Sequence, residues 1–289
     1  MKEQDCLRRF LFEELGVRGE WVRLNASWQK SKQHQQLNAV VQEQLGQILA
    51  ASVLLSATIK YQGSIILQAQ GSGDLKTLVA QATHDRKIRG LARNNAEVAD
   101  GSLNEMMGEG QLVITVEPEQ GEPYQGITSL KGNELADVIT NYFLQSEQLE
   151  TRVWLFANES YAAGLFIQEL PAQDNYQADW ERIVTLANTV TKEEMLSLDC
   201  EEMLYRLFNE EKVRLFTEEP VVFECTCSRQ KVEKTLFSLG RKELETILQE
   251  RNNIEVNCEF CGGKQIFDKI DVENILSADP VNPVSDTRH

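Results

Sequence analysis

Hydrophobic and polar positions alternate along several short stretches of the first 175 or so residues. In residues 21–28, for example, Val22, Leu24, Ala26 and Trp28 are separated by polar residues. This period of two is typical of a β-strand with one buried face. On this basis and on strand-like runs elsewhere, the sequence predicts strands over residues 21–28, 64–70, 75–82, 87–93, 111–117, 124–130, 152–157 and 165–170. The Gly-Ser-Gly-Asp segment at residues 71–74 predicts a hairpin turn between two of these strands.

Two stretches change to a helical period. Residues 36–59 predict a helix that becomes apolar on all sides in its second half, which indicates burial all round. Residues 133–149 predict a second, amphipathic helix with one apolar face, formed by Leu135, Val138, Ile139, Tyr142 and Phe143. Runs of strands with few intervening helices favour an α+β fold over a doubly wound sheet. A chain of 289 residues can therefore hold one large α+β domain and a smaller one.

A charged segment follows this predicted domain. Residues 179–219 carry eleven acidic and five basic residues and still keep apolar residues at helical spacing: Met195, Leu196, Met203, Leu204, Leu207 and Phe208. Thr191 and Glu194 have the spacing of a capping box, which favours a helix start there. Two interpretations remain open: an ordinary solvated helical connector, or a marginal segment that folds only while something at its end holds it.

Four of the six cysteines lie in the last quarter of the chain. Cys225 and Cys227 form a C-x-C pair, and thirty residues later Cys258 and Cys261 form a C-x-x-C pair that continues into Gly262-Gly263. Four thiolates complete a tetrahedral zinc shell, and two close pairs far apart in sequence are a usual way to supply it. The glycines allow the positive φ that a metal-binding knuckle needs. One zinc ion is the favoured prediction. The alternatives are disulfides within the pairs, of which the C-x-C one would be strained, or buried non-ligand thiols.

The remaining two cysteines, Cys6 and Cys200, have no nearby partner in the sequence and are predicted to be packed or incidental thiols. The first five residues are polar and no apolar signal-peptide core follows them. The longest apolar stretch, residues 45–59, contains polar side chains and is short for a membrane span. These features predict a cytoplasmic protein without a membrane partner, in a compartment where thiols stay reduced.

Charge and motifs exclude several function classes. The net charge of −16 opposes nucleic-acid binding, and residues 223–289 carry nine Lys/Arg against twelve Asp/Glu. The chain lacks a nucleophile elbow, an H-E-x-x-H helix and a phosphate-binding loop, so neither an enzyme nor a nucleotide site is predicted. Four thiolates also leave zinc no open position for catalysis. The site is then either a static staple for a small module or a redox switch.

The cysteine segments also resemble a known protein family. The block Phe223-Glu224-Cys225-Thr226-Cys227-Ser228-Arg229, followed by Cys258-Glu259-Phe260-Cys261, resembles the redox-switch module of the 33 kDa chaperonin family (HslO). Upstream segments at residues 88–93, 124–127, 142–149 and 206–211 are similar to that family in the same order, and the resemblance covers about residues 7–267.

The resemblance implies an ATP-independent holdase chaperone that is activated by oxidation. Cys225, Cys227, Cys258 and Cys261 would bind zinc in the reduced state and become disulfides Cys225–Cys227 and Cys258–Cys261, releasing the metal. It also implies a homodimer on activation and unfolded client proteins as partners. The domains would be a chaperone core at 1–178, a metastable helical linker at 179–222 and a zinc module at 223–289. The alternative is a static zinc-ribbon-like regulatory or RNA-associated protein.

A hidden client surface needs a mask, since large exposed apolar patches are rare on soluble proteins. The candidate latch that packs the linker on the N-terminal sheet is the apolar stripe Leu196, Leu204, Leu207 and Phe208.

Overall fold

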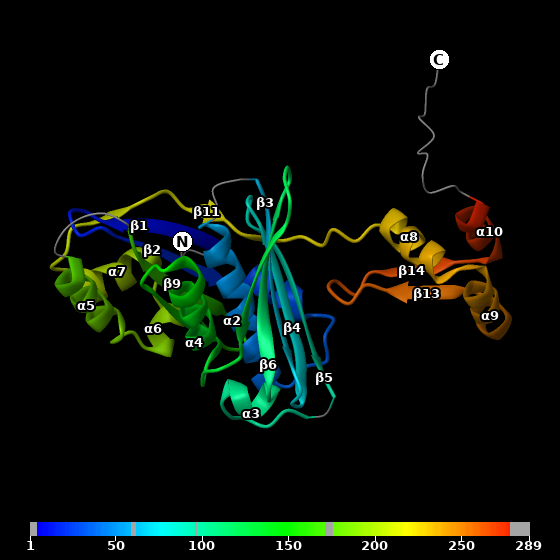
Figure 1. Cartoon of the computed structure of the whole chain (residues 1–289), viewed down its shortest axis with the longest axis horizontal. Helices are drawn as coiled ribbons and strands as arrows, with labels where there is room; N and C mark the ends of the chain where they lie inside the picture. The colour runs from blue at the N-terminus through cyan, green and yellow to red at the C-terminus, as the bar shows by residue number, and fades with distance from the viewer. Residues whose placement is uncertain (1–4, 59–61, 96, 171–175, 278–289) are drawn as a thin grey trace, which may run out of the picture. The chain divides into compact units, whose positions relative to one another are not determined.

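The structure is a computed structural model that describes residues 5–58, 62–95, 97–170 and 176–277. Its contacts divide the chain into two compact units, residues 1–224 and 225–289 (Figure 1). Residues 1–4 lie outside the described residues; they belong to the polar N-terminal stretch on which the prediction of no signal peptide rested. Residues after 277, part of the predicted zinc module, also lie outside them.

The first sheet of the N-terminal unit, sheet A, is antiparallel. Its strand order is β10-β1-β2-β9-β8, with β11 pairing alongside β10 on the same edge of β1. The bounds are β1 Cys6–Phe12, β2 Val17–Leu24, β8 Thr151–Ala157, β9 Ala162–Glu169, β10 Val213–Leu215 and β11 Glu219–Pro220. Sheet A thus joins the start of the chain to residues more than 200 positions later.

The second sheet, sheet B, has the order β12-β5-β4-β3-β6-β7. Its bounds are β3 Gly63–Gly71, β4 Leu75–Thr83, β5 Lys87–Asn94, β6 Gly110–Pro118, β7 Tyr124–Ser129 and β12 Val222–Phe223. All pairs are antiparallel except the short pair β12–β5, which is parallel. The predicted strands of this sheet are confirmed, as is the turn at residues 71–74.

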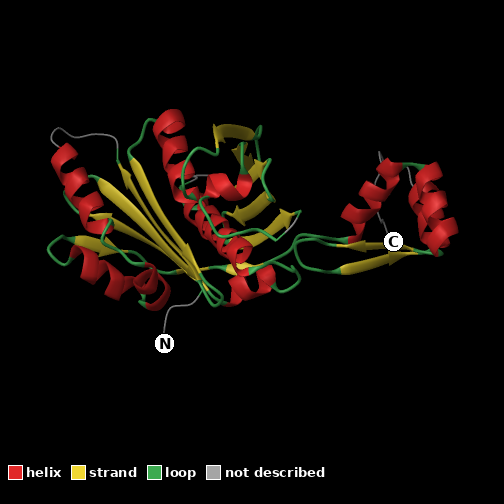
Figure 2. Ribbon diagram, turned by 90° about the horizontal axis from the view of Figure 1, so that it is seen from below, coloured by secondary structure: helices red, strands yellow, loops and turns green. Residues whose placement is uncertain are grey.

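Helix α2, Ala39–Ser56, lies between the two sheets and is buried on nearly every side along its second half (Figure 2). It is the one described helix that is long and apolar enough to cross a membrane by length and composition, and 67% of its span is buried inside the protein. The other helices before residue 150 are α1 Ala26–Lys32, α3 Leu103–Met107, α4 Leu135–Tyr142 and the π-helical turn η1 Phe143–Glu147. The all-round apolar pattern therefore marked the central helix correctly.

Three helices cover the opposite face of sheet A. They are α5 Tyr176–Ala187, α6 Lys192–Ser197 and α7 Cys200–Phe208. The predicted capping box is present, because Thr191 Oγ1 accepts the Glu194 N–H and the Glu194 carboxylate accepts the Thr191 N–H. By contacts these helices belong to the unit 1–224. Their status as a separate, metastable linker stays a prediction.

The predicted strand at residues 21–28 is wrong in its second half, since β2 ends at Leu24 and α1 begins at Ala26. The cause is Asp5, whose carboxylate accepts the N–H groups of Ala26 and Ser27, at 2.8 Å each. Asp5 therefore satisfies donors that a helix start leaves unpaired, from about twenty residues away. A cap supplied at that distance leaves no local signal in the sequence.

The C-terminal unit is small. It contains α8 Arg229–Leu239, α9 Arg241–Arg251, the hairpin β13 Ile254–Asn257 and β14 Lys264–Phe267, and α10 Lys269–Ser277. Its described buried core is six side chains: Leu236, Leu244, Ile254, Phe267, Val272 and Ile275.

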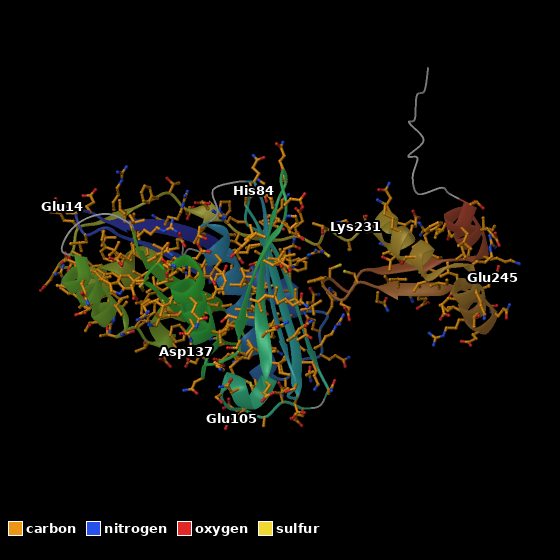
Figure 3. The ribbon with its side chains drawn as sticks, in the orientation of Figure 1. Glu14, His84, Glu105, Asp137, Lys231 and Glu245 are labelled. Atoms are coloured by element: carbon orange, nitrogen blue, oxygen red, sulfur yellow. The ribbon has the colours of Figure 1, made fainter. Side chains whose placement is uncertain are left out.

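The fold as a whole is α+β, as predicted, with a large sheet-and-helix unit and a terminal cluster of four cysteines. Charged side chains such as Glu14, Glu105 and Asp137 project from the N-terminal unit, and Lys231 and Glu245 from the module (Figure 3). Among the described residues, the buried charged side chains of the N-terminal unit are Glu20, Arg23 and Arg86.

Candidate metal centre and the covered face of sheet A

Two separate pieces of the C-terminal unit carry the four cysteines. Cys225 and Cys227 lie on the irregular segment before α8, whose N-cap Ser228 accepts the Lys231 N–H. Cys258 and Cys261 lie in the turn of the β13–β14 hairpin. The fold therefore brings together two pairs that are thirty residues apart.

The hairpin turn is shaped by main-chain hydrogen bonds around the second pair. The Gly262 N–H donates to the Cys258 carbonyl at 2.7 Å, and the Cys258 N–H donates to the Gly263 carbonyl at 2.9 Å. Gly262 has φ 69°, a left-handed conformation that favours glycine. A Cβ at Gly263 would stand 3.2 Å from the Cys261 sulfur, so a side chain there would crowd the site. Both glycines thus serve the knuckle predicted from the sequence.

The four sulfurs form one compact group. Cys225 Sγ lies 3.6 Å from Cys258 Sγ, Cys227 Sγ lies 3.4 Å from Cys261 Sγ, and all four lie within 4.8 Å of one another. A tetrahedral zinc site with Zn–S bonds of about 2.3 Å requires S···S separations of roughly 3.8 Å. The donor set and spacing therefore fit a metal ion. Cys6 and Cys200 are buried in the N-terminal unit and take no part in this cluster.

The electrostatics of the cluster also favour a cation. Burial acts to raise the pKa of Cys225, but hydrogen bonds from the Cys227 backbone N–H and the neighbouring thiols lower it to about 7. Burial raises the pKa of Cys227 and of Cys261. Neighbouring thiolates repel one another, so four of them in this volume need a counter-charge. A bound dication supplies one.

Arg229 supports the module next to the first cysteine pair. Its guanidinium stacks over the Phe267 ring at 4.3 Å, pairs with Asp271 at 2.7 Å and donates to the Ile266 carbonyl at 3.2 Å. This side chain thereby ties the start of α8 to β14 and α10. The resemblance had included Arg229 without giving it a role.

The second feature is the interface between helices α5–α7 and sheet A. Leu196, Leu204, Leu207 and Phe208 are all buried in one cluster with side chains of β1, β2 and β9. Phe208 meets the Phe12 ring edge-on, with centroids 4.9 Å apart. The cluster also contains Met195 and Met203, which the sequence pattern included, and further residues that it did not: Trp180, Ile183, Ala187, Val190 and Cys200. The apolar stripe is thus wider than the sequence pattern indicated.

Sequence reasoning missed the residues on the sheet side of this interface. They are Phe10 and Phe12 of β1, Val17 and Trp21 of β2, and Ala163, Leu165 and Ile167 of β9. Alternation in the stretch C-L-R-R-F-L-F could have indicated β1, but two adjacent arginines interrupt it. Arg23 was also missed; it is buried, and it donates to the Leu198 carbonyl at the end of α6 at 2.5 Å.

The class of this protein is defined by two features. One is a two-sheet α+β unit in which charged helices cover one face of a sheet, and the other is a four-thiol module that follows it in the chain. Comparison with known proteins agrees with that class. The family model for the Hsp33 protein matches residues 5–268. The 33 kDa chaperonin of Nitrosococcus oceani is 56% identical over the full length of both chains, and that of Methylobacillus flagellatus is 43% identical, also over both full lengths.

The chain belongs to the Hsp33 family, whose curated relatives are named 33 kDa chaperonins. The fold has a solved counterpart in the crystal structure of the 33 kDa chaperonin (heat shock protein 33 homolog) of Thermotoga maritima. That structure aligns with a TM-score of 0.81 at 22% identity over 94% of this chain and 98% of the other. A chaperone function follows from the family.

Proposed function

We propose that this protein is an ATP-independent holdase in which oxidation of the four cysteines releases zinc and uncovers a client-binding surface. Zinc would be held by Cys225, Cys227, Cys258 and Cys261 in the reduced, inactive state. The proposal assigns the two disulfides as Cys225–Cys227 and Cys258–Cys261, as the family resemblance implies. Its clients are unfolding proteins, and it acts in the cytoplasm as a homodimer once oxidised.

One observation carries the proposal: a broad apolar surface lies beneath a segment whose far end leads into the four-thiol module. If α5–α7 left sheet A, the side chains of Phe10, Phe12, Trp21, Leu165 and Ile167 would lose their cover. An exposed apolar patch of this kind binds other apolar chains. In the closed state these residues are fully buried or nearly so, which accounts for an inactive resting form.

The chemistry needs only the sulfurs and an oxidant such as hydrogen peroxide. A thiolate attacks the peroxide oxygen, giving a sulfenic acid and hydroxide; the second thiol of the pair then attacks that sulfur and water leaves. Each pair is oxidised by two electrons and each peroxide is reduced to two waters. A disulfide sulfur is a poor zinc ligand, because zinc binds thiolates, so oxidation of both pairs releases the ion.

Metal loss would unfold the module, because its described core is only six side chains. Binding of a structural zinc contributes on the order of 10 kcal/mol to a small module of this kind. Residue 224 directly precedes Cys225, and residues 213–223, which contain β10, β11 and β12, connect the module to α7. Disorder that begins at the module would therefore spread to the segment that ends the mask.

To distinguish the redox switch from a static zinc site, we would measure the zinc stoichiometry and the number of free thiols before and after peroxide treatment. A light-scattering assay with an aggregating client would measure chaperone activity on the same samples. We expect one zinc per reduced chain, no zinc after oxidation, and client protection without ATP only in the oxidised form. Retained metal and unchanged activity after complete thiol oxidation would instead favour the static zinc-ribbon-like alternative.

A further inference from the structure

The segment that connects α7 to the metal module, residues 212–224, borders both sheets of the N-terminal unit; we refer to it as the strap. Its first part, β10 and β11, pairs antiparallel with β1, at the edge of sheet A. Its last part, β12, pairs parallel with β5, at the edge of sheet B. One extended segment thus occupies two sheet edges in succession.

Main-chain hydrogen bonds hold the strap. The Phe216 N–H donates to the Arg9 carbonyl at 2.9 Å, the Val222 N–H to the Arg86 carbonyl at 3.1 Å, and the Glu224 N–H to the Ile88 carbonyl at 3.1 Å. Apolar burial is modest, because Val221, at 2% exposure, is the one buried residue of the strap, all of which is described, and Val213 and Leu215 are only partly buried against the cluster on sheet A. Segments with few buried apolar contacts open at low free-energy cost.

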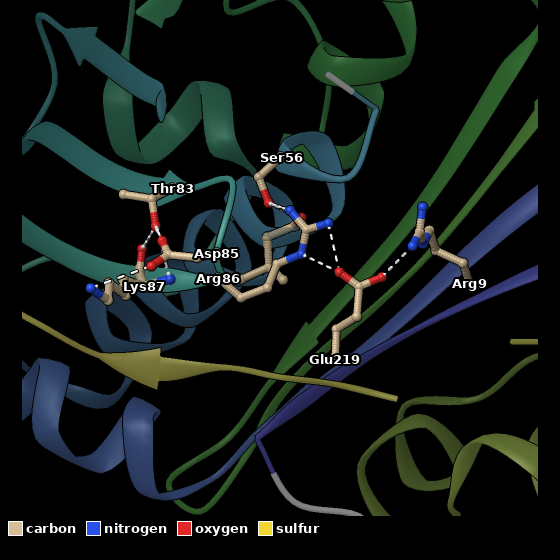
Figure 4. A network of polar contacts seen from close by, with 8 residues as sticks. Arg9, Ser56, Thr83, Asp85, Arg86, Lys87 and Glu219 are labelled. Atoms are coloured by element: carbon tan, nitrogen blue, oxygen red, sulfur yellow. Dashed lines mark hydrogen bonds and ion pairs between the residues drawn. The ribbon is translucent and has the colours of Figure 1, made fainter. Parts of the chain in front are cut away.

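Ion pairs add to the attachment of the strap (Figure 4). Glu219 lies between two arginines, with Arg9 Nη2 at 2.8 Å from one carboxylate oxygen and Arg86 Nη2 at 2.9 Å from the other. Arg86 is buried and also donates to Ser56 Oγ at the end of α2, at 2.9 Å. At the last residue of the strap, Glu224 pairs with Lys87 at 3.1 Å.

We propose that the edges of β1 and β5 are a binding site for an extended, carboxylate-bearing segment of an unfolded polypeptide, which replaces the strap by β-strand addition. An edge strand with unpaired N–H and C=O groups is a template for another extended chain. The strap shows the geometry, since these edges already hold an extended segment in a defined register. The proposal rests on the proposed function only for the oxidative step that displaces the strap.

Charge selects the occupant. Arg8 and Arg9 on β1 and Lys87 and Arg89 on β5 make both edges basic, although the chain as a whole is acidic. Departure of Glu219 would remove the carboxylate that contacts the buried Arg86 guanidinium, and loss of a close partner from a buried charge is costly. A client segment with an Asp or Glu at the corresponding position restores that pair. The site therefore favours acidic extended segments over neutral ones of the same hydrophobicity.

The test uses a fluorescently labelled peptide with the sequence of residues 212–224 and the full-length protein, with binding followed by fluorescence anisotropy. Two substitutions open the strap without oxidation: Glu219→Lys repels Arg9 and Arg86, and Val221→Ser removes the one buried side chain of the strap. We expect both variants, reduced and zinc-loaded, and the oxidised wild type to bind the peptide at least about tenfold more tightly than reduced wild type does.

Matched peptides define the mode of binding. N-methylation at Phe216 removes a donor to β1, whereas by strand alternation the Leu215 N–H points away from β1. We expect the first change to weaken binding about tenfold and the second to have little effect. Glu219→Gln in the peptide should also weaken binding about tenfold, because it removes a charge-assisted hydrogen bond.

Equal binding of the two N-methylated peptides, or peptide binding that no opening variant enhances, would overturn the proposal. The redox step is judged separately, by zinc release and by hydrogen exchange across residues 176–208. If the oxidised protein loses zinc and helix protection but does not bind the peptide, the proposed function stands and the edge site is wrong. If the opening variants bind the peptide but oxidation of the wild type releases no zinc, the edge site stands and the redox mechanism is wrong.

Discussion

The N-terminal unit and the C-terminal module differ in what holds them together. The N-terminal unit buries apolar side chains in two clusters, one on each face of sheet A. The module buries six described side chains and gathers four thiols within 4.8 Å. A small unit cannot bury enough apolar surface to be stable alone and commonly depends on a metal or disulfides. We therefore propose that chemical sensitivity resides in the module and that the apolar surface for client chains lies in the larger unit.

Removing the metal should produce the largest difference between the two units. Cys258→Ser leaves three thiolates, so we expect zinc affinity to fall sharply and the module to unfold, with a loss on the order of 10 kcal/mol. The N-terminal sheets should remain folded, as judged by hydrogen exchange. Cys200→Ser is the matched control, since Cys200 is buried among α5–α7 and sheet A. Loss of zinc in Cys200→Ser would contradict the ligand assignment.

Opening the mask directly is the next largest change. Replacing both Leu204 and Leu207 with Ser removes two buried side chains from the interface with sheet A, at about 2–5 kcal/mol each. We expect the reduced double variant to suppress client aggregation in a light-scattering assay. Tyr205→Ser on the same helix is the control, because Tyr205 is 74% exposed. A folded, zinc-loaded double variant no more active than wild type would rule these leucines out as the latch.

Within the module, Arg229 and Arg241 make a matched pair. Arg229 stacks on Phe267 and joins α8 to β14 and α10, so Arg229→Ala should lower module stability by about 1–2 kcal/mol. Arg241 forms exposed ion pairs with Glu245 and Glu273, and Arg241→Ala should cost less than about 1 kcal/mol. Zinc release during urea titration measures both. Equal effects would show that the stack contributes nothing.

The smallest effect concerns pH and the N-terminal unit. Burial raises the pKa of Glu20 to about 7, although Arg18, Arg86 and Arg9 oppose the rise and Glu219 adds to it. The folded state therefore holds this proton more tightly than the unfolded chain, so the contribution of Glu20 to stability is greatest at low pH and is lost as pH rises through 7. Between pH 6 and pH 8 the free energy of unfolding should fall by about 1 kcal/mol.

Urea denaturation of the zinc-loaded protein checks this dependence, and Glu20→Gln should remove it. A wild-type slope that survives in the Glu20→Gln variant would assign the pH dependence to another group.

Hydrophobic patterning determined much of the fold. The strands of sheet B, the buried helix α2 and the capping box at Thr191 are local features, set by residues that are neighbours along the chain. The cysteine spacing likewise predicted one metal-sized cluster, because pairs on a short segment and in a tight turn have few ways to place their sulfurs. The family resemblance, which added the redox assignment, rested on the same cysteine block together with short segments between residues 88 and 211.

Other features were decided only by tertiary contacts. Helix α1 begins where Asp5, about twenty residues earlier, accepts its first N–H groups. The strap joins both sheets through Glu219, which pairs with Arg9 and with Arg86, each of them at least 133 residues away in the sequence. The covered face of sheet A exists because α5–α7 meet β1, a strand formed near the other end of the same unit. Short-range patterns specify which face of an element is apolar, but the choice of which faces meet belongs to packing of the whole unit.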